Sequence, residues 1–426
     1  MIMARHEEQL VEVVLPDLRL EAGASVTAPL ARMQIMAPPG AVLVDAAARV
    51  SGEAARALAS GQWVERSGAA LDRRRDELSS ASVRLDSDLP VVLVVHALTG
   101  DMRLGGDGGW WAPLVGPGRP LDPTRAVLLC VNNLGSCYGS AGPADADFPH
   151  RDADEEPWAG LEGPGGFDPA AACGAGVRLP ATITTWDQAR FLLAALDAIR
   201  VERPITVAGG SVGGMIALAL ATLAPDRVDR VLPIAASAAA GAWIQGFNHT
   251  ARMLVLSDPD SASGGGRGLE LARQIAHMTY RAPAGLSERQ GRRQAERERW
   301  SAGSPYAVQT YLEYQGRKLR RRFHAGAYLA QLDAMDHHDI SRRPPGTDAG
   351  PWGLARLTMP LTAIGIDSDM LYPAIAMRQV VDALLAHGRP AAYRELRSAH
   401  GHDGFLIEWT GMATLLAEAL DTAEAR

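Results

Sequence analysis

The chain has 426 residues, 47% of them hydrophobic and 21% charged, which is typical of a folded globular protein. This length suits one large domain with an insertion, or two or three average domains. A net charge of −7 argues against a nucleic-acid-binding protein. No apolar run approaches the ~18 residues of a membrane span, and the charged first ten residues do not resemble a signal peptide. Three cysteines without metal-ligand spacing predict reduced thiols, no metal site and a cytoplasmic location.

The first 88 residues predict little regular structure. Alternating apolar residues predict an antiparallel edge strand over Leu10–Leu20. Short helices are expected at Ala54–Leu58 and Ala69–Leu78, and the charged run Asp72–Glu77 is interpreted as a solvated helix face. No chemistry is assigned to residues 37–86.

Two continuous apolar runs, Leu89–His96 and Ala126–Val131, predict strands buried on both faces. Each is followed by turn-forming residues, in His96–Gly100 and in residues 132–143. These loops are expected at the carboxyl edge of a sheet, where open α/β sheets place their sites. The next segment, residues 144–179, is predicted to be a surface insertion without a core of its own.

The most informative stretch is a short apolar run from Ile205 that ends in two glycines, followed by Ser211, two more glycines and a small-residue helix from Met215. Gly209, Ser211 and Gly213 form the G-x-S-x-G pattern in the strand–turn–helix context of a nucleophile elbow. The sharp turn needs glycine beside the serine and leaves its hydroxyl exposed at a helix N-terminus, where negative charge is stabilised. A phosphate-binding loop is the alternative, but no lysine follows.

The alternation of strands and helices predicts a mostly parallel, doubly wound sheet. Further elements are expected as strands at Val228–Ala235, Met359–Ile366 and Ala391–Leu396, and as helices at Thr185–Ile199, Ala374–His387 and Phe405–Ala423.

The alternation stops between residues 238 and 351. This part is expected to be a helical lid, which divides the core into residues 1–237 and 352–426. Its predicted helices are residues 247–280, 286–300 and 305–335.

Two polar motifs of this region are interpreted as structural. The run Arg289–Arg299 is expected to be a solvated helix face. The adjacent His337 and His338 lack the i, i+4 spacing of a metal site on a helix.

A nucleophile needs a base and an acid, and both follow late strands. Asp367 or Asp369 follows one strand, and His400 or His402 follows the last. The order serine, aspartate, histidine is that of α/β-hydrolases. A histidine near neutrality takes and returns the serine proton, while a buried carboxylate orients the imidazole. Spacing leaves both choices open, and the member left out is expected to be a loop-end polar group or a cap.

The oxyanion of acyl transfer needs two backbone donors. They are expected from Val212 N–H and from the His96–Gly100 turn at Leu98 N–H.

At this point the chain resembles the homoserine O-acetyltransferases over residues 89–143 and 179 to the end. The resemblance rests on His96–Gly100, Gly109–Trp111, Gly116–Gly118, Asn132–Pro143, Gly210–Met215, Phe247-Asn248 with Arg252, Tyr311–Gly316, Ser368–Pro373 and Gly401–Leu406.

The resemblance implies the triad Ser211, Asp369 and His402, with Leu98 and Val212 as oxyanion donors. It also implies an α/β-hydrolase fold whose lid helices pair two subunits into a homodimer.

The resemblance further implies an acyltransferase that moves an acetyl group from acetyl-CoA, a co-substrate rather than a bound cofactor, to the hydroxyl of L-homoserine in methionine biosynthesis. Arg252 matches the arginine that holds the substrate carboxylate, and Asp403 the acid near its amino group. A lid ion pair and a helix cap are the alternative interpretations of these two residues.

Departures from the family pattern keep the substrates open. Val212 replaces the usual methionine, Asn133 replaces an apolar residue, and His249-Thr250 replaces an acid and an apolar residue. A succinyl donor, a serine acceptor and an esterase remain alternatives.

Overall fold

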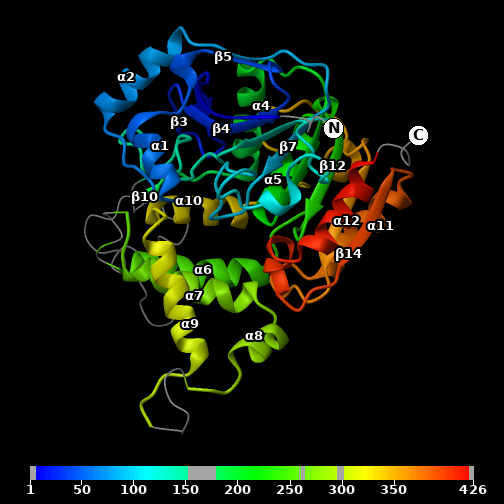
Figure 1. Ribbon diagram of the computed structural model, residues 1–426. Helices are drawn as coiled ribbons and strands as arrows, with labels where there is room; N and C mark the ends of the chain where they lie inside the picture. The colour runs from blue at the N-terminus through cyan, green and yellow to red at the C-terminus, as the bar shows by residue number, and fades with distance from the viewer. Residues whose placement is uncertain (1–5, 152–178, 259, 261–263, 295–301, 422–426) are drawn as a thin grey trace.

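The computed structural model describes residues 6–151, 179–258, 260, 264–294 and 302–421 (Figure 1). Its centre is an eight-stranded sheet with the order β1-β4-β8-β7-β11-β12-β13-β14. The pairs β1–β4 and β4–β8 are antiparallel and all other neighbours are parallel. The strands are β1 (Glu7–Val14), β4 (Leu30–Ala37), β7 (Val91–Val95), β8 (Val127–Val131), β11 (Ile205–Gly210), β12 (Val228–Ile234), β13 (Leu361–Ile366) and β14 (Ala391–Leu396).

Shorter strands form three two-stranded pairs outside the main sheet. They are β2 (Leu18–Arg19) with β3 (Ser25–Val26), β5 (Val42–Val44) with β6 (Val83–Leu85), and β9 (His150–Arg151) with β10 (Leu179–Pro180).

The helices are α1 (Gly52–Ala59), α2 (Gly68–Ser79), α4 (Thr185–Ala198), α5 (Val212–Leu223), α6 (Ala242–Leu256), α7 (Arg267–Tyr280), α8 (Pro283–Gln290), α9 (Ala307–Arg320), α10 (Ala325–Asp336), α11 (Ala374–Ala386) and α12 (Trp409–Leu420). The helices α4, α5, α11 and α12 alternate with the parallel strands, while α6 to α10 are inserted between β12 and β13. Among the described residues, none of these helices is long and apolar enough to cross a membrane.

The middle of the sheet is completely enclosed, as the sequence predicts. Every residue of β7, β8 and β11 is buried, because helices cover both faces of a parallel sheet. The helix α4 begins with a capping box, in which Thr184 and Asp187 satisfy each other's backbone N–H groups. The predicted strands and helices of the parallel part are confirmed.

The antiparallel start differs from its prediction. The first strand is β1 rather than Leu10–Leu20, and its partner β4 was not predicted. All of β4 is buried, but Arg32 and Gln34 interrupt its apolar pattern. Arg32 pairs with Glu12, and the side-chain oxygen of Gln34 accepts a hydrogen bond from Leu104 N at 2.7 Å.

The helix α2 is only partly solvated, so the interpretation of residues 72–77 as a solvated face is wrong for Arg74 and Arg75, while Arg73 is exposed. Arg74 Nε donates to Glu12 Oε2 at 2.7 Å. Burial alone would raise the pKa of Glu12, but Arg32, Arg66 and Arg74 lower it to about 2. The same cluster supports the loop after β8, since Arg66 Nη1 donates to Gly139 O at 3.1 Å.

The segment predicted as a surface insertion is anchored at both ends. Ala144 and Phe148 are buried, and Asp145 pairs with Arg66 at 2.6 Å. The antiparallel pair β9–β10 joins the two ends. The interpretation as a segment without a core is therefore wrong for residues 144–151 and 179, while residues 152–178 lie outside the described part.

The helices between β12 and β13, here called the inserted helices α6–α10, are shorter than predicted. The expected helix 247–280 is two helices: α6 ends at Leu256, and α7 begins only after the glycines at 264–266, where Gly264 has a φ of +84°. The expected helix 305–335 ends at Arg320 and restarts after His324, whose side chain caps α10. In Figure 1, α6, α7, α8 and α9 are grouped on one side of the molecule, away from the sheet.

The other expected elements of this half also change. The expected helix 286–300 is α8, which begins at Pro283, while residues 295–301 lie outside the described part. The expected final helix 405–423 begins only at Trp409, after a short 3-10 helix over Gly401–Leu406.

Candidate active site

Ser211 stands at the turn between β11 and α5, as the elbow motif predicts. Its backbone has φ 60° and ψ −128°, a region that costs a residue with a side chain roughly 1–3 kcal/mol. Its N–H donates to Ile234 O at 2.9 Å, which ties the turn to the neighbouring strand β12. The residue is 5% exposed and lies at the N-terminus of α5, so the helix dipole favours negative charge beside its hydroxyl.

The glycines around Ser211 are needed for close approach of backbone to backbone. A Cβ on Gly213 would lie 2.2 Å from Val95 O, at the end of β7. A Cβ on Gly209 would lie 2.3 Å from Gly213 O, and one on Gly210 would lie 2.4 Å from the Phe405 ring. The start of α5 therefore sits directly against the end of β7 and against the segment that carries His402.

His402 and Asp369 form the pair that spacing alone left open. His402 Nδ1 and Asp369 Oδ2 are 2.7 Å apart, and both residues are buried. The other oxygen of Asp369 accepts hydrogen bonds from the backbone N–H groups of Leu371 and Tyr372, at 2.8 and 3.0 Å. The carboxylate is thus oriented by its own loop, and it orients the imidazole in turn.

Asp367 and His400, the alternatives to Asp369 and His402, contact other residues instead. Asp367 Oδ1 accepts a hydrogen bond from Ser398 N at 3.0 Å and so joins two loop ends. His400 lies 3.4 Å from Arg289 Nη2 and 3.6 Å from Glu408.

Aromatic rings enclose His402. The ring centroids of Tyr280, Tyr372 and Phe405 lie 5.8, 5.4 and 5.7 Å from that of His402. Phe405 also touches the elbow, as described for Gly210, and the Tyr372 hydroxyl lies 3.9 Å from Met215 Sδ in α5. These rings exclude water and connect the histidine loop to the serine turn.

The charge on His402 depends on Asp369. Burial alone would lower the pKa of His402, but the Asp369 carboxylate and its hydrogen bond raise it above the ordinary value of 6.5. The protonated imidazole is therefore stabilised, as a base that must hold a proton during acyl transfer requires.

The turn after β7 presents a second set of backbone donors. Gly100 N donates to Ala97 O at 2.9 Å, which closes the turn around Leu98. Among the described residues, neither Leu98 N–H nor Val212 N–H donates to a protein acceptor. Both belong to segments that Gly213 brings into contact, so they can receive an oxyanion.

Asn133, which departs from the family pattern, supports this turn. Asn133 N donates to His96 Nε2 at 2.9 Å, and Asn133 Nδ2 donates to His96 O at 3.1 Å. Burial lowers the pKa of His96, so the imidazole is neutral and can accept the first of these bonds. His96 therefore links the segment after β7 to the segment after β8 by hydrogen bonds.

Arg252 is buried in α6 and faces acidic residues of α10. Its Nη2 lies 3.0 Å from Asp333 Oδ1 and 2.6 Å from Asp336 Oδ2. Asn248 Nδ2 donates to Asp336 Oδ1 at 2.7 Å. Arg252 therefore makes the ion pairs that its alternative interpretation expects.

Asp403 lies beside His402 in the 3-10 helix and does not cap the final helix, so that interpretation is wrong. The residue before α12 is Glu408. Asp403 Oδ2 instead lies 3.1 Å from Arg281 Nε, at the end of α7. Burial raises the pKa of Asp403, and Arg281 opposes this effect.

In the remaining histidine motif, His338 lies between the start of α4 and the segment after β12. His338 is buried and lies 2.9 Å from Thr185 Oγ1 and 3.0 Å from Ser237 O. In the described ranges, no group of three histidine, cysteine, aspartate or glutamate side chains is arranged to hold a metal ion.

Sequence reasoning missed the groups that surround His402. Tyr372 and Phe405 lie inside motifs that carried the resemblance, so their spacing from Asp369 and His402 was an available signal. Tyr280 ends α7 and Arg281 follows it; both are far from these motifs in the chain, and no local pattern marks them.

The sheet order, the strained serine and the Asp369–His402 pair define the class of protein. The α/β hydrolase fold family matches residues 90–408, so the chain is an α/β-hydrolase-fold protein.

Relatives narrow the class. The chain is 40% identical over 359 residues to a homoserine O-acetyltransferase of Thermus thermophilus, covering 79% of this chain and 80% of that protein. It is 35% identical over 342 residues to a homoserine O-succinyltransferase of Bordetella pertussis, covering 74% and 75%. The chain therefore belongs to the homoserine O-acetyltransferase family, acyltransferases of the α/β-hydrolase fold, which confirms the resemblance.

A solved structure agrees with this fold. The crystal structure of a homoserine O-acetyltransferase from Staphylococcus aureus superposes with a TM-score of 0.64 at 22% identity, covering 98% of this chain and 96% of that one.

The close approach at Gly213 predicts a large loss of stability for Gly213→Ala. The added Cβ would meet Val95 O at 2.2 Å, so we expect the free energy of unfolding to fall by about 2–4 kcal/mol. Gly246→Ala is the matched control, because Gly246 is exposed in α6 with nothing within 4 Å of its Cβ position. The free energy of unfolding of this variant should rise by ~1 kcal/mol, since alanine favours the helix. Urea unfolding measures the free energy of unfolding of both variants, and equal changes in the two would contradict the close packing of Gly213.

The His402–Asp369 pair predicts the pH dependence of serine acylation. The neutral imidazole is the base, so labelling of Ser211 by an active-site phosphonate should accelerate as pH rises, with a midpoint above 6.5. Asp369→Asn removes the carboxylate that raises this pKa, so the midpoint should move down, and labelling should slow on the order of 10³–10⁴-fold. An unchanged midpoint in Asp369→Asn would show that another group governs the titration.

Proposed function

We propose that this protein transfers an acetyl group from acetyl-CoA to the side-chain hydroxyl of L-homoserine, through an acyl-enzyme on Ser211, as a step of methionine biosynthesis. The observation that carries the proposal is the buried Asp369–His402 pair, packed through Phe405 against the strained serine turn. Membership of the homoserine O-acetyltransferase family supports the choice of substrates.

The first half-reaction places the acetyl group on the enzyme. His402 takes the hydroxyl proton of Ser211 as Oγ attacks the thioester carbonyl, and Asp369 stabilises the resulting imidazolium. Leu98 N–H and Val212 N–H stabilise the oxyanion. When the intermediate collapses, His402 gives its proton to the departing thiolate of CoA, and the acetyl ester of Ser211 remains.

The second half-reaction repeats these steps with homoserine. His402 takes the proton of the homoserine hydroxyl as it attacks the ester, and returns a proton to Ser211 when the product leaves. Arg252 is proposed to hold the carboxylate of homoserine, and Asp403 its ammonium group. In support, Arg252 pairs with Asp336, which also accepts a hydrogen bond from Asn248. Asn248 lines a small cavity together with Tyr280, whose ring centroid lies 5.8 Å from that of His402.

Transfer rather than hydrolysis requires that water be kept from the acyl-enzyme. The triad residues are at most 6% exposed, and α7 supplies the Tyr280 ring over His402. This enclosure favours an acyltransferase over an esterase. The succinyl-transferring relative from Bordetella pertussis makes succinyl-CoA the second candidate donor, and serine is the second candidate acceptor.

We further propose that residues 238–351 act as a lid between core segments 1–237 and 352–426, and that two chains pair through the lid helices. Trp243 in α6 and Met278 in α7 support this pairing, since they are 54% and 44% exposed. A cytoplasmic location is proposed because the thiols of Cys130 and Cys137 are free.

Thiol release from acetyl-CoA tests the reaction directly. With homoserine added, the enzyme should release CoA continuously, while without an acceptor it should release only about one equivalent per site. Ser211→Ala should lose at least ~10³-fold in rate, because the nucleophile is gone. Succinyl-CoA and serine are run in parallel, and sustained release without any acceptor would identify a hydrolase instead.

Arg252 variants test the acceptor site. Arg252→Lys keeps the charge near Asp333 and Asp336 but loses the planar fork that grips a carboxylate. We expect KM for homoserine to rise about tenfold or more, while the burst of CoA release on acylation of Ser211 is largely preserved. Arg252→Ala should have a larger effect and also lower stability, because the partly buried Asp336 loses its arginine, whereas Asp333 keeps its contact with Arg151. Equal losses in both half-reactions would indicate a structural role.

A further inference from the structure

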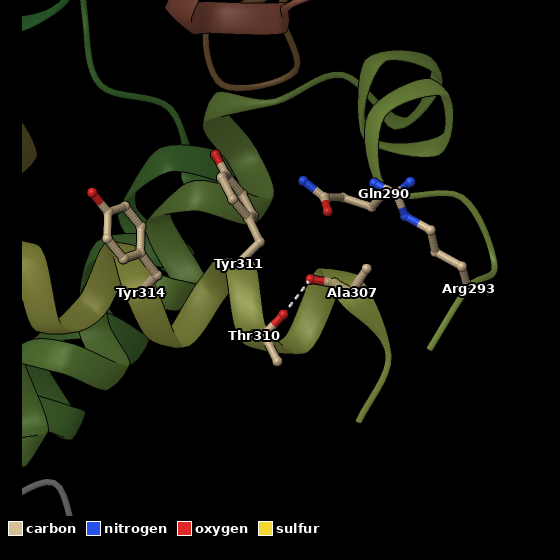
Figure 2. A pocket seen from close by; sticks show the side chains of 6 residues that line it. All are labelled: Gln290, Arg293, Ala307, Thr310, Tyr311 and Tyr314. Carbon is tan, nitrogen blue, oxygen red and sulfur yellow. Dashed lines mark hydrogen bonds between the residues drawn. The ribbon is translucent and has the colours of Figure 1, made fainter. Parts of the chain in front are cut away.

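A groove of ≈ 440 Å³ lies between the end of α8 and the side of α9. Two tyrosines of α9, Tyr311 and Tyr314, form one wall, and Gln290 and Arg293 form the other (Figure 2). In this view the amide of Gln290 points toward Tyr311, and the guanidinium of Arg293 lies beside it. The Tyr314 ring is 56% exposed, so an aromatic face is open at the surface.

The arginines at this groove have no acidic partner among the residues that the structure describes. Arg293 Nη2 donates to the backbone carbonyl of Arg289 at 3.0 Å, so the Arg293 guanidinium is held at the last turn of α8. Arg289 Nη2 lies 3.4 Å from His400 Nε2, on the loop that carries His402. Both arginines are exposed, so an anion in solvent can reach them.

More positive charge lies behind the tyrosine wall. His277 is buried there, and its ring lies 5.8 Å from that of Tyr311. Burial, together with four nearby cations, lowers the pKa of His277 to about 2; the cations are Arg273, Arg281, Lys318 and Arg322. The imidazole is therefore neutral, and it adds no charge to a region that is already positive.

The groove leads toward the catalytic histidine. A smaller cavity of ≈ 40 Å³ shares Gln290 and Tyr311 with it and extends to Arg281 and His400. Three ring contacts of 5.7–5.8 Å connect Tyr311 to His402, by way of His277 and Tyr280.

A close backbone contact fixes α8 at this place. A Cβ on Gly285 would lie 2.1 Å from Ala399 O, so α8 is seated directly on the loop that precedes His402.

We propose that this groove binds the 3′-phosphorylated adenosine diphosphate end of the acyl-CoA donor, an inference that rests on the function proposed above. Acyl-CoA carries its thioester at one end of a long flexible arm and three phosphate groups at the other. Arginines bind phosphate oxygens with charge-assisted hydrogen bonds, and tyrosine rings stack on a purine base. Arg289 and Arg293 hold the phosphates, Tyr311 and Tyr314 receive the adenine, and the arm extends past Arg281 to Ser211.

The test compares two donors that share the thioester and the arm. Acetyl-CoA has the nucleotide, and S-acetylpantetheine lacks it. In the wild type, kcat/KM should be higher for acetyl-CoA, and this preference should weaken as salt screens the phosphates. Arg289→Ala with Arg293→Ala should raise KM for acetyl-CoA at least tenfold and bring the two donors' kcat/KM values close together. Tyr314→Ala should likewise lower the ratio of kcat/KM for acetyl-CoA to kcat/KM for S-acetylpantetheine.

Arg292→Ala is the matched control. Arg292 is an exposed arginine of the same turn that does not line the groove, so it should keep the full preference for acetyl-CoA. Circular dichroism of each variant checks that it is folded.

Three outcomes overturn the proposal. Equal losses with both donors would mean that these residues support the fold or the chemistry, and no loss with either would mean that the nucleotide binds elsewhere. A change of oligomeric state in the groove variants, with the donor preference intact, would assign the groove to a second copy of this chain.

Binding of adenosine 3′,5′-bisphosphate, measured by calorimetry, separates this proposal from the function on which it rests. Binding that is lost in the double arginine variant would support the groove even if acetyl-CoA were not turned over. Turnover of acetyl-CoA without such binding would support the function and overturn the groove.

Discussion

The backbone of Ser211 adopts a conformation that its own residue type disfavours, and the surrounding packing has to hold it there. The strain is balanced by contacts that only glycine permits, between Gly213 and the end of β7 and between Gly210 and Phe405. These contacts set how closely α5, β7 and the His402 segment approach one another. The proposed nucleophile, the turn of the proposed oxyanion donor and the proposed base are therefore positioned by one region of tight packing.

A buried charge pair adds the second constraint. Asp369 remains an acceptor of two backbone N–H groups while it holds His402. In a site enclosed by aromatic rings these interactions are stronger than they would be in water, and an unpaired charge there would be costly. Tyr280 completes the enclosure from α7, so the inserted helices contribute to the electrostatics of the triad as well as to its exclusion of water.

The parallel part of the fold and the elbow were predictable because their signals are local. A buried strand is a short apolar run, and Ser211 stands between glycines directly after one. The strand β4 was missed because its buried Arg32 and Gln34 are satisfied by Glu12 and by the loop at Leu104, which are distant in sequence. The helix boundaries after residue 242 were misjudged for a similar reason, since tertiary contacts and glycine turns decide where α7 begins and where α9 ends.

The sequence by itself determined the fold class, the serine of the elbow motif and the chain order of the proposed catalytic groups, because each depends on residue type and on neighbours along the chain. It left open which aspartate and which histidine act. Only the tertiary structure brings Asp369 to His402, places Arg281 against Asp403 and places the tyrosines of α9 opposite Arg293, which follows α8. Those choices depend on distances between segments far apart in sequence, and such distances arise only when the chain packs.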